Sequence, residues 1–242
     1  MKEIKILHLF PRLLNLYGEY ANVSVLKYYL EKNGISVHVD MCDGAPEDLE
    51  KYDMVYISSG TEENIVYAAK VLSPFRDRIA GSIEKGTQWL CCGNALAVFG
   101  KEIIDSEKVC HEALNIFPFS SNEEKSRFSG DVLAKSKYAD SLIGYVNNSY
   151  RFEGISTPFS ELLLNRQLGN DKKNPEEGLE YKNFIASTLT GPLLVKNPHL
   201  TEILTERLVG ERVCIPEEDN IKKAYRQTMK HMASRAEQTA KN

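Results

Sequence analysis

The sequence lacks a surplus of basic residues and has no long apolar run. Lys and Arg total 30 against 34 Asp and Glu, which gives a formal net charge of −4 at pH 7. Tight binding to a phosphate backbone needs basic residues that release counterions, so we expect no nucleic-acid partner. No apolar run approaches the roughly 18 residues that cross a bilayer, and the N-terminal "MKEIKILHLFPRLLN" has charges and a proline where a signal peptide needs an unbroken apolar segment. We therefore expect a cytoplasmic protein with no membrane insertion.

Cysteine is also scarce, and its spacing excludes two classes of site. The five cysteines are Cys42, Cys91, Cys92, Cys110 and Cys214. An odd number without dense spacing does not fit the disulfide framework of a small secreted domain, so we expect reduced thiols. The adjacent Cys91 and Cys92 lack the two-residue gap of a CxxC knuckle, and the other cysteines supply no second knuckle. We therefore expect no metal site and no cofactor.

What is present is the pattern of one folded α/β domain over residues 1–242. Hydrophobic residues make up 42% of the chain and charged residues 26%, as in ordinary globular proteins. The patterns predict strands at 4–10, 35–40, 52–60 and 86–92, and helices at 17–34 and, interrupted at Pro74, at 62–85. Strands that alternate with helices predict a three-layer, flavodoxin-like fold with a mostly parallel sheet flanked by helices.

The pattern is weaker after Gly100. The polar segment 117–130 is interpreted as a loop, and only short strands are predicted between 130 and 165. The Gly, Asn, Asp and Pro content of 167–178 indicates a solvated loop. From about residue 217 a helical tail rich in Lys, Arg and Glu is expected.

One stretch, "WLCCGNALAVFG" (89–100), has the order of a nucleophile elbow: a buried strand, a reactive side chain, a glycine and a helix. Cys92 would lie at the helix N-terminus, where the dipole favours the thiolate. The N–H groups of Gly93 and of Gly60, in the loop after the third strand, could then face an oxyanion. Cys91 points to the other face and is expected to pack in the core. The alternative interpretation is that packing alone explains a buried Cys-Gly pair.

Four separated segments resemble one family. The elbow is similar to the Cys-Gly-Gly-x-Gln-x-Leu-Gly motif of class I glutamine amidotransferases of the cobyric acid synthase type. Residues 9–35 resemble the Tyr-Pro-Asp-Leu-Leu-Asn-Leu-Tyr-Gly-Asp-Arg-Gly-Asn opening of the amidotransferase subunits of lipid II isoglutaminyl synthase. Residues 169–178 resemble their Gly-Asn-Asn and Glu-Gly loop, and 188–200 their Tyr-Leu-His-Gly-Pro-Leu-Leu-Pro-Lys-Asn-Pro segment. The resemblance implies glutamine as substrate and a Mur-ligase-like synthetase as partner.

The resemblance also implies a mechanism that this sequence does not fully support. In the family a Cys attacks the side-chain amide of glutamine, a thioester forms, and a His acts as acid and base while ammonia leaves. The nucleophile carries over to Cys92, but Thr190 stands at the His position. Threonine cannot deliver a proton near neutral pH, and loss of an acid–base residue costs about 10²- to 10⁴-fold in rate.

Other departures concern the same site. The family's Gly-Gly-Gly-Gln-Asp loop reads "SSGTEEN" at 58–64, and its Phe-Glu-Asn-His-Gly-Gly loop reads "FEGISTPF" at 152–159. The second glycine of the elbow is Asn94, and its Gln is Leu96. His111 is the one histidine that could be tested as a replacement base.

Three functions remain open. The chain could be a glutaminase subunit impaired by the missing histidine, with Cys92 as nucleophile and Gly60 and Gly93 as oxyanion donors. It could be a catalytically silent binding or scaffold subunit on the same fold. A reactive elbow cysteine could also serve a thiol hydrolase with another substrate.

Overall fold

The computed structural model describes residues 3–44, 46 and 48–239, with side chains to residue 234. Its first sheet has six strands in the order β11-β12-β4-β3-β1-β2. These strands are β1 (Glu3–Leu9), β2 (Ser36–Cys42), β3 (Met54–Ile57), β4 (Gln88–Cys92), β11 (Leu179–Tyr181) and β12 (Phe184–Ser187). All neighbouring pairs are parallel except β11 with β12. The predicted parallel sheet is confirmed.

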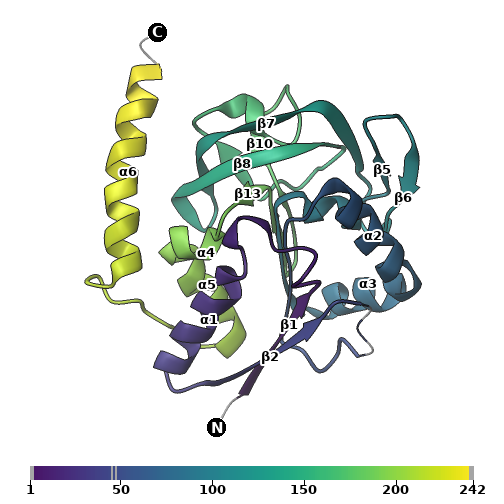
Figure 1. Cartoon of the computed structure of the whole chain (residues 1–242). Helices are drawn as coiled ribbons and strands as arrows, with labels where there is room; N and C mark the ends of the chain where they lie inside the picture. The colour runs from purple at the N-terminus through teal and green to yellow at the C-terminus, as the bar shows by residue number, and fades with distance from the viewer. Residues whose placement is uncertain (1–2, 45, 47, 240–242) are drawn as a thin grey trace.

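Helices cover both faces of this sheet, as Figure 1 shows. The helices on one face are α1 (Ala21–Lys32), α4 (Leu193–Lys196) and α5 (Pro198–Val209), and those on the other are α2 (Glu62–Leu72) and α3 (Arg76–Lys85). Each face has its own large cluster of buried apolar side chains, because successive residues of a strand point in opposite directions. The predicted three-layer α/β class is therefore confirmed.

Local sequence signals set several helix ends. Gly34 follows α1 with a φ of 77°, a left-handed conformation that glycine adopts without strain. The Thr61 hydroxyl caps α2 by accepting a hydrogen bond from the Asn64 N–H at 3.3 Å. Pro74 lies in the short 3₁₀ segment η2 (Ser73–Phe75) between α2 and α3. The interruption predicted at Pro74 is confirmed.

A second, largely antiparallel sheet lies over the carboxyl end of the first (Figure 1). Its strands are β5 (Glu102–Ile104), β6 (Cys110–Glu112), β7 (Ser120–Ser136), β8 (Ala139–Glu153), β9 (Ser160–Leu162), β10 (Glu176–Glu177) and β13 (Leu189–Thr190). The long hairpin of β7 and β8 dominates it. The prediction of a loop over 117–130 was wrong from Ser120 onward, because pairing with β8 satisfies the backbone while the polar side chains of β7 stay partly exposed.

The remaining elements are peripheral. Two 3₁₀ turns, η1 (Leu16–Gly18) and η4 (Arg166–Leu168), precede α1 and β10. The C-terminal helix α6 (Asn220–Thr239) begins close to the predicted residue 217 and lies along the side of the molecule (Figure 1). Met232 on α6 is buried against Leu133 and Ile143 of the hairpin. In the part of the chain that the structure describes, no helix is long and apolar enough to cross a membrane.

Candidate active site

The turn from β4 into the following helix is made by Gly93. Cys92 has extended backbone angles, with φ −116° and ψ 145°, whereas Gly93 has a φ of 64°. The segment after it, η3 (Gly93–Phe99), is a 3₁₀ helix. Cys92 remains in the strand because it pairs with Ser187 of β12. The sharp change of chain direction therefore falls one residue after the cysteine.

The two cysteines point to opposite faces of the first sheet, and both are fully buried. Cys91 packs in the cluster that includes Trp89 and Phe99, whose rings meet edge to face at 5.7 Å between centroids. This confirms the prediction that Cys91 belongs to the core. Cys92 belongs to the cluster on the other face, which includes Leu90 and Tyr56. Neither thiol reaches solvent.

The surroundings of Cys92 do not favour a thiolate. Burial raises the pKa of Cys92 well above its usual value, and the nearby carboxyl of Glu19 raises it further. Asn22 Nδ2 lies 3.7 Å from Sγ, and a hydrogen bond with the Tyr56 hydroxyl opposes part of the rise in pKa. The prediction that the helix N-terminus lowers the pKa of this thiol was wrong, because desolvation outweighs a short 3₁₀ segment.

The loop after β3 carries the other expected oxyanion donor, Gly60, and its polar groups are already bonded. The Gly60 N–H donates to Asn94 Oδ1 at 3.1 Å, and Asn94 Nδ2 donates to the Gly60 carbonyl at 2.8 Å. One residue earlier, the Ser59 N–H donates to Glu19 Oε2 at 2.8 Å. Both N–H groups therefore have internal acceptors.

Ser59 and Thr190 both lie close to Gly93. A Cβ atom at residue 93 would be 1.8 Å from Ser59 Oγ and 3.4 Å from Thr190 Cγ2, so a side chain there would require Ser59 to move. The Ser59 side chain is buried and lies close enough to the Glu19 carboxyl to lower the pKa of that group. The loop after β3, the turn after β4 and the segment that contains Thr190 therefore meet at Gly93.

Thr190 is held by the second sheet. Its hydroxyl donates to the Tyr145 carbonyl at 2.8 Å, and its residue is 2% exposed. Lys196 Nζ donates to the Thr190 carbonyl at 3.4 Å. His111 lies on β6, where its Nε2 is 2.9 Å from Asp105 Oδ2. The polar contacts of His111 are therefore at β6 and the β5–β6 turn, not at Thr190.

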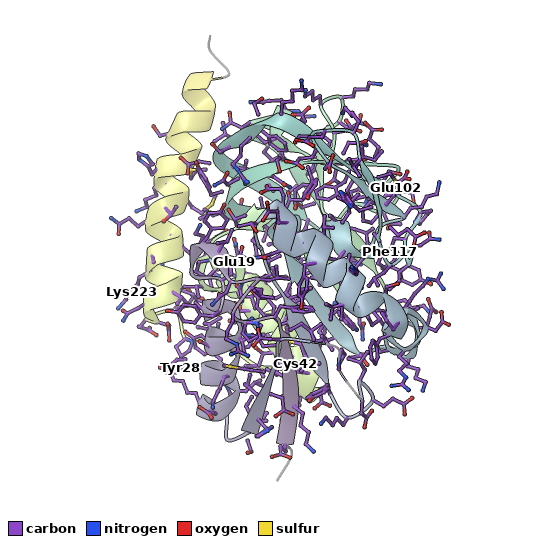
Figure 2. The ribbon with its side chains drawn as sticks, turned by 45° about the vertical axis from the view of Figure 1, so that its right-hand side comes forward. Glu19, Tyr28, Cys42, Glu102, Phe117 and Lys223 are labelled. Carbon is purple, nitrogen blue, oxygen red and sulfur yellow. The ribbon has the colours of Figure 1, made fainter. Side chains whose placement is uncertain are left out.

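Sequence reasoning missed Glu19, which is fully buried just before α1 (Figure 2). Burial raises the pKa of Glu19 to about 7, although the Ser59 and Gly191 N–H groups and the Lys196 charge oppose that rise. The second oxygen, Oε1, has no hydrogen-bond partner in the described part of the chain. The family's opening motif has an Asp at the matching place, and that was the available signal.

A second buried carboxyl, Glu177, was also missed. It accepts hydrogen bonds from the hydroxyls of Ser160 at 2.7 Å and Ser187 at 3.1 Å, and it also accepts from the Thr188 N–H. Burial raises its pKa. Because Ser187 pairs with Cys92, this carboxyl adds negative potential near the thiol and disfavours its ionisation.

Comparisons with known proteins identify relatives that match most of the chain. A profile of the CobB/CobQ-like glutamine amidotransferase domain matches residues 5–198. The chain is 27% identical over 217 residues to the "Lipid II isoglutaminyl synthase (glutamine-hydrolyzing) subunit GatD" of Staphylococcus aureus (strain N315), covering 89% of this chain and 88% of that protein. It is 24% identical over 228 residues to the protein of the same name from Streptococcus pneumoniae (strain ATCC BAA-255 / R6), covering 90% of this chain and 87% of that protein.

Solved structures agree on the fold. A crystal structure of a glutamine amidotransferase has a TM-score of 0.55 and 15% sequence identity, over 84% of this chain and 98% of that one. The structure of PurLQS from Thermotoga maritima has a TM-score of 0.50 and 11% identity, over 78% of this chain and 87% of that one. At these identities the likeness concerns the fold.

Proposed function

Because the chain belongs to the CobB/CobQ-like glutamine amidotransferase family, we propose that it is an amidotransferase-like subunit whose glutaminase site is silent. In this proposal it keeps the fold and the surface that a synthetase partner recognises. It does not hydrolyse glutamine at a useful rate. The partner, a Mur-ligase-like protein, would then use free ammonia.

One observation carries the proposal: the left-handed turn between β4 and η3 falls on Gly93, with Ser59 and Thr190 beside it. An elbow exposes its nucleophile because that residue occupies the strained turn. The family motif ends in a glycine seven residues after its cysteine, and Gly93 stands seven residues before Gly100. In this register the nucleophile position is Gly93, and Cys92 becomes a buried residue of the strand.

The chemistry of glutamine hydrolysis has little support in this arrangement. A glycine cannot attack an amide, and a threonine cannot protonate the departing nitrogen. The Gly60 N–H is bonded to Asn94, and the Ser59 N–H is bonded to the Glu19 carboxyl. When ionised, that carboxyl would repel a developing oxyanion instead of stabilising it.

The proposal of a partner rests on the relatives. Both curated relatives are named as subunits of lipid II isoglutaminyl synthase, and this chain covers 88% and 87% of their lengths. A chain that keeps this length can keep the docking surface after losing catalysis. Glutamine remains a candidate ligand, because the three segments still meet around Gly93.

The test is ammonia release from glutamine, measured for the wild type, Cys92→Ala and Cys91→Ala, each alone and with a ligase-like partner. We expect the wild type to release no more ammonia than the buffer. Cys91→Ala is the matched control, because it removes a thiol of equal burial from the opposite face. Wild-type turnover that disappears in Cys92→Ala and persists in Cys91→Ala would contradict the proposal.

A second experiment attempts to restore glutaminase activity by mutation. The triple variant Ser59→Gly, Gly93→Cys and Thr190→His removes the oxygen that a Cβ at residue 93 would meet and supplies a nucleophile with a base. We expect this variant to release ammonia. The double variant Gly93→Cys, Thr190→His, which retains Ser59, should release ammonia at least about tenfold more slowly. The reason is that the new cysteine side chain cannot take its position without displacing Ser59.

A further inference from the structure

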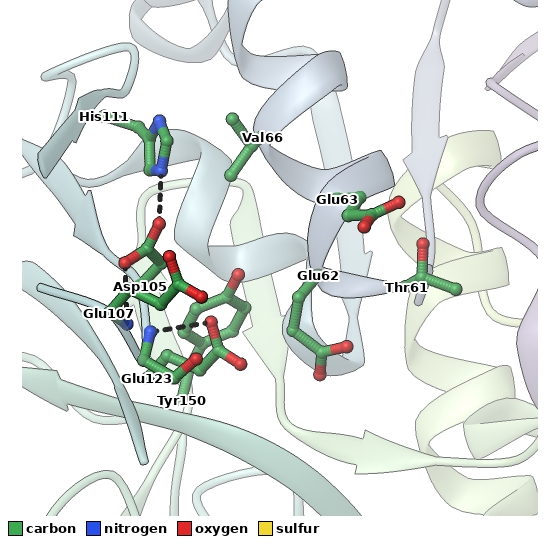
Figure 3. A pocket seen from close by; sticks show the side chains of 10 residues that line it. Thr61, Glu62, Glu63, Val66, Asp105, Glu107, His111, Glu123 and Tyr150 are labelled. Atoms are coloured by element: carbon green, nitrogen blue, oxygen red, sulfur yellow. Dashed lines mark hydrogen bonds and ion pairs between the residues drawn. The ribbon is translucent and has the colours of Figure 1, made fainter. Parts of the chain in front are cut away.

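A large cavity, which Gly93 does not line, lies between the N-terminal half of α2 and the second sheet (Figure 3). Its volume is about 700 Å³, within the range of small-molecule sites. Five carboxylates line it: Glu62, Glu63, Asp105, Glu107 and Glu123. They come from three separate segments of the chain, so only the tertiary structure brings them together.

Two of these carboxylates contact an Arg or His side chain and three do not. Glu62 is paired with Arg127, and Asp105 is 2.9 Å from the His111 ring. Among the residues that the structure describes, Glu63, Glu107 and Glu123 form no ion pair with Lys, Arg or His. Burial, and after it the negative charges of Glu62 and Asp105, raise the pKa of Glu123. The cavity therefore has uncompensated negative charge.

Tyr150 supplies the second observation. This residue is 1% exposed, lines the cavity, and its ring lies among the carboxylates in Figure 3. Its hydroxyl has no hydrogen-bond partner among the residues described. A buried hydroxyl without a partner is costly, and native structures rarely leave one in that state. An N–H donor in the cavity would give the phenol oxygen its missing bond.

The arrangement of the carboxylates limits the ligand. In the described part of the chain, no three His, Cys, Asp or Glu side chains are close enough together to hold a metal ion. Charge spread along a wall instead suits a ligand whose cationic groups are separated by an alkyl chain. Ammonium groups can donate to Glu123 and Tyr150, while methylenes contact Val66 on α2.

We infer that this cavity binds an aliphatic amine that carries two or more ammonium groups. The cavity adjoins the proposed glutaminase site, because Thr61, Glu62 and Glu63 belong to the 58–64 segment, but none of Cys92, Gly93 and Thr190 lines it. Glutaminase activity and amine binding can therefore be tested separately.

The experiment is isothermal titration of the full chain with spermidine and with cadaverine at low ionic strength. The uncharged 1,5-pentanediol serves as a matched ligand control. We expect one equivalent of spermidine to bind, cadaverine to bind more weakly, and the diol to show no binding. Binding should weaken as NaCl is raised, because the contacts are charged and the cavity is partly open.

Four variants locate the site. Glu123→Gln and Tyr150→Phe should weaken spermidine binding by about tenfold and about threefold, since charged hydrogen bonds are stronger than neutral ones. Glu63→Gln, at an exposed position on α2, should weaken it by about threefold without disturbing the core. Glu211→Gln removes one exposed charge from the end of α5 and is the matched control, with a change below about twofold.

Three results would overturn the inference. The first is no heat of binding with either amine. The second is equal weakening in Glu211→Gln and in the cavity variants, which would mean that the amine responds to net charge alone. The third is retention of full affinity by Glu63→Gln and by a Tyr150→Phe protein of unchanged melting temperature.

Discussion

The substitution Glu19→Gln should stabilise the protein, and more at alkaline than at acidic pH. Glu19 is fully buried, and its pKa is raised from 4.5 to about 7. A raised carboxyl pKa means that the folded state holds the proton more tightly, so the stability it confers is present below pH 4.5 and is lost as pH rises through 7. Glutamine keeps an oxygen that can accept from the Ser59 N–H but never ionises.

The magnitude follows from the size of the shift. A shift of about 2.5 pKa units corresponds to about 3 kcal/mol at 1.36 kcal/mol per unit, and most of it develops between pH 5 and pH 8. We expect the free energy of unfolding of Glu19→Gln, minus that of the wild type, to grow by about 2 to 3 kcal/mol over this interval. Urea titrations followed by tryptophan fluorescence at four pH values would measure it.

The comparison must be made between the two proteins at each pH, because another buried group titrates in the same range. Burial lowers the pKa of His8 to about 4, so its contribution is present above pH 6.5 and is lost as pH falls toward 4. His8 is common to both proteins, and its effect cancels in the difference. A difference that stays constant from pH 5 to pH 8, or that shrinks, would show that Glu19 does not carry a raised pKa.

Two further outcomes test the packing around the site. Iodoacetamide should modify the exposed Cys110 and Cys214 in the native protein and should not modify Cys92 until the chain unfolds. Peptide mass spectrometry would measure the labelling, and rapid labelling of Cys92 in the native protein would contradict its burial. Phe99→Ala should lower the free energy of unfolding by about 3 to 5 kcal/mol in urea titrations, because Phe99 is fully buried and the centroid of its ring is 4.8 Å from that of Phe184. A loss below about 1 kcal/mol would mean that neighbouring side chains repack and fill the cavity.

Much of the first sheet could be predicted from local pattern. Short apolar runs bounded by glycine or proline predicted β1 to β4, and Pro74 and Gly34 marked the ends of helices correctly. The hairpin of β7 and β8 was missed in part, because strand 120–136 carries many polar residues that its partner leaves exposed. A strand in which polar side chains predominate has little apolar alternation for a sequence pattern to detect.

The sequence by itself determined the α/β class, the family resemblance and the approximate place of the turn at 92–93. Only the tertiary structure decided which residue makes that turn, because Cys92 pairs with Ser187 as the last residue of β4 and Gly93 takes the left-handed conformation beside Ser59 and Thr190. It also decided that Glu19 is buried against the Ser59 N–H and that carboxylates from α2 and the second sheet share one cavity. These are contacts between segments far apart in the chain, and local patterns of polarity do not encode them.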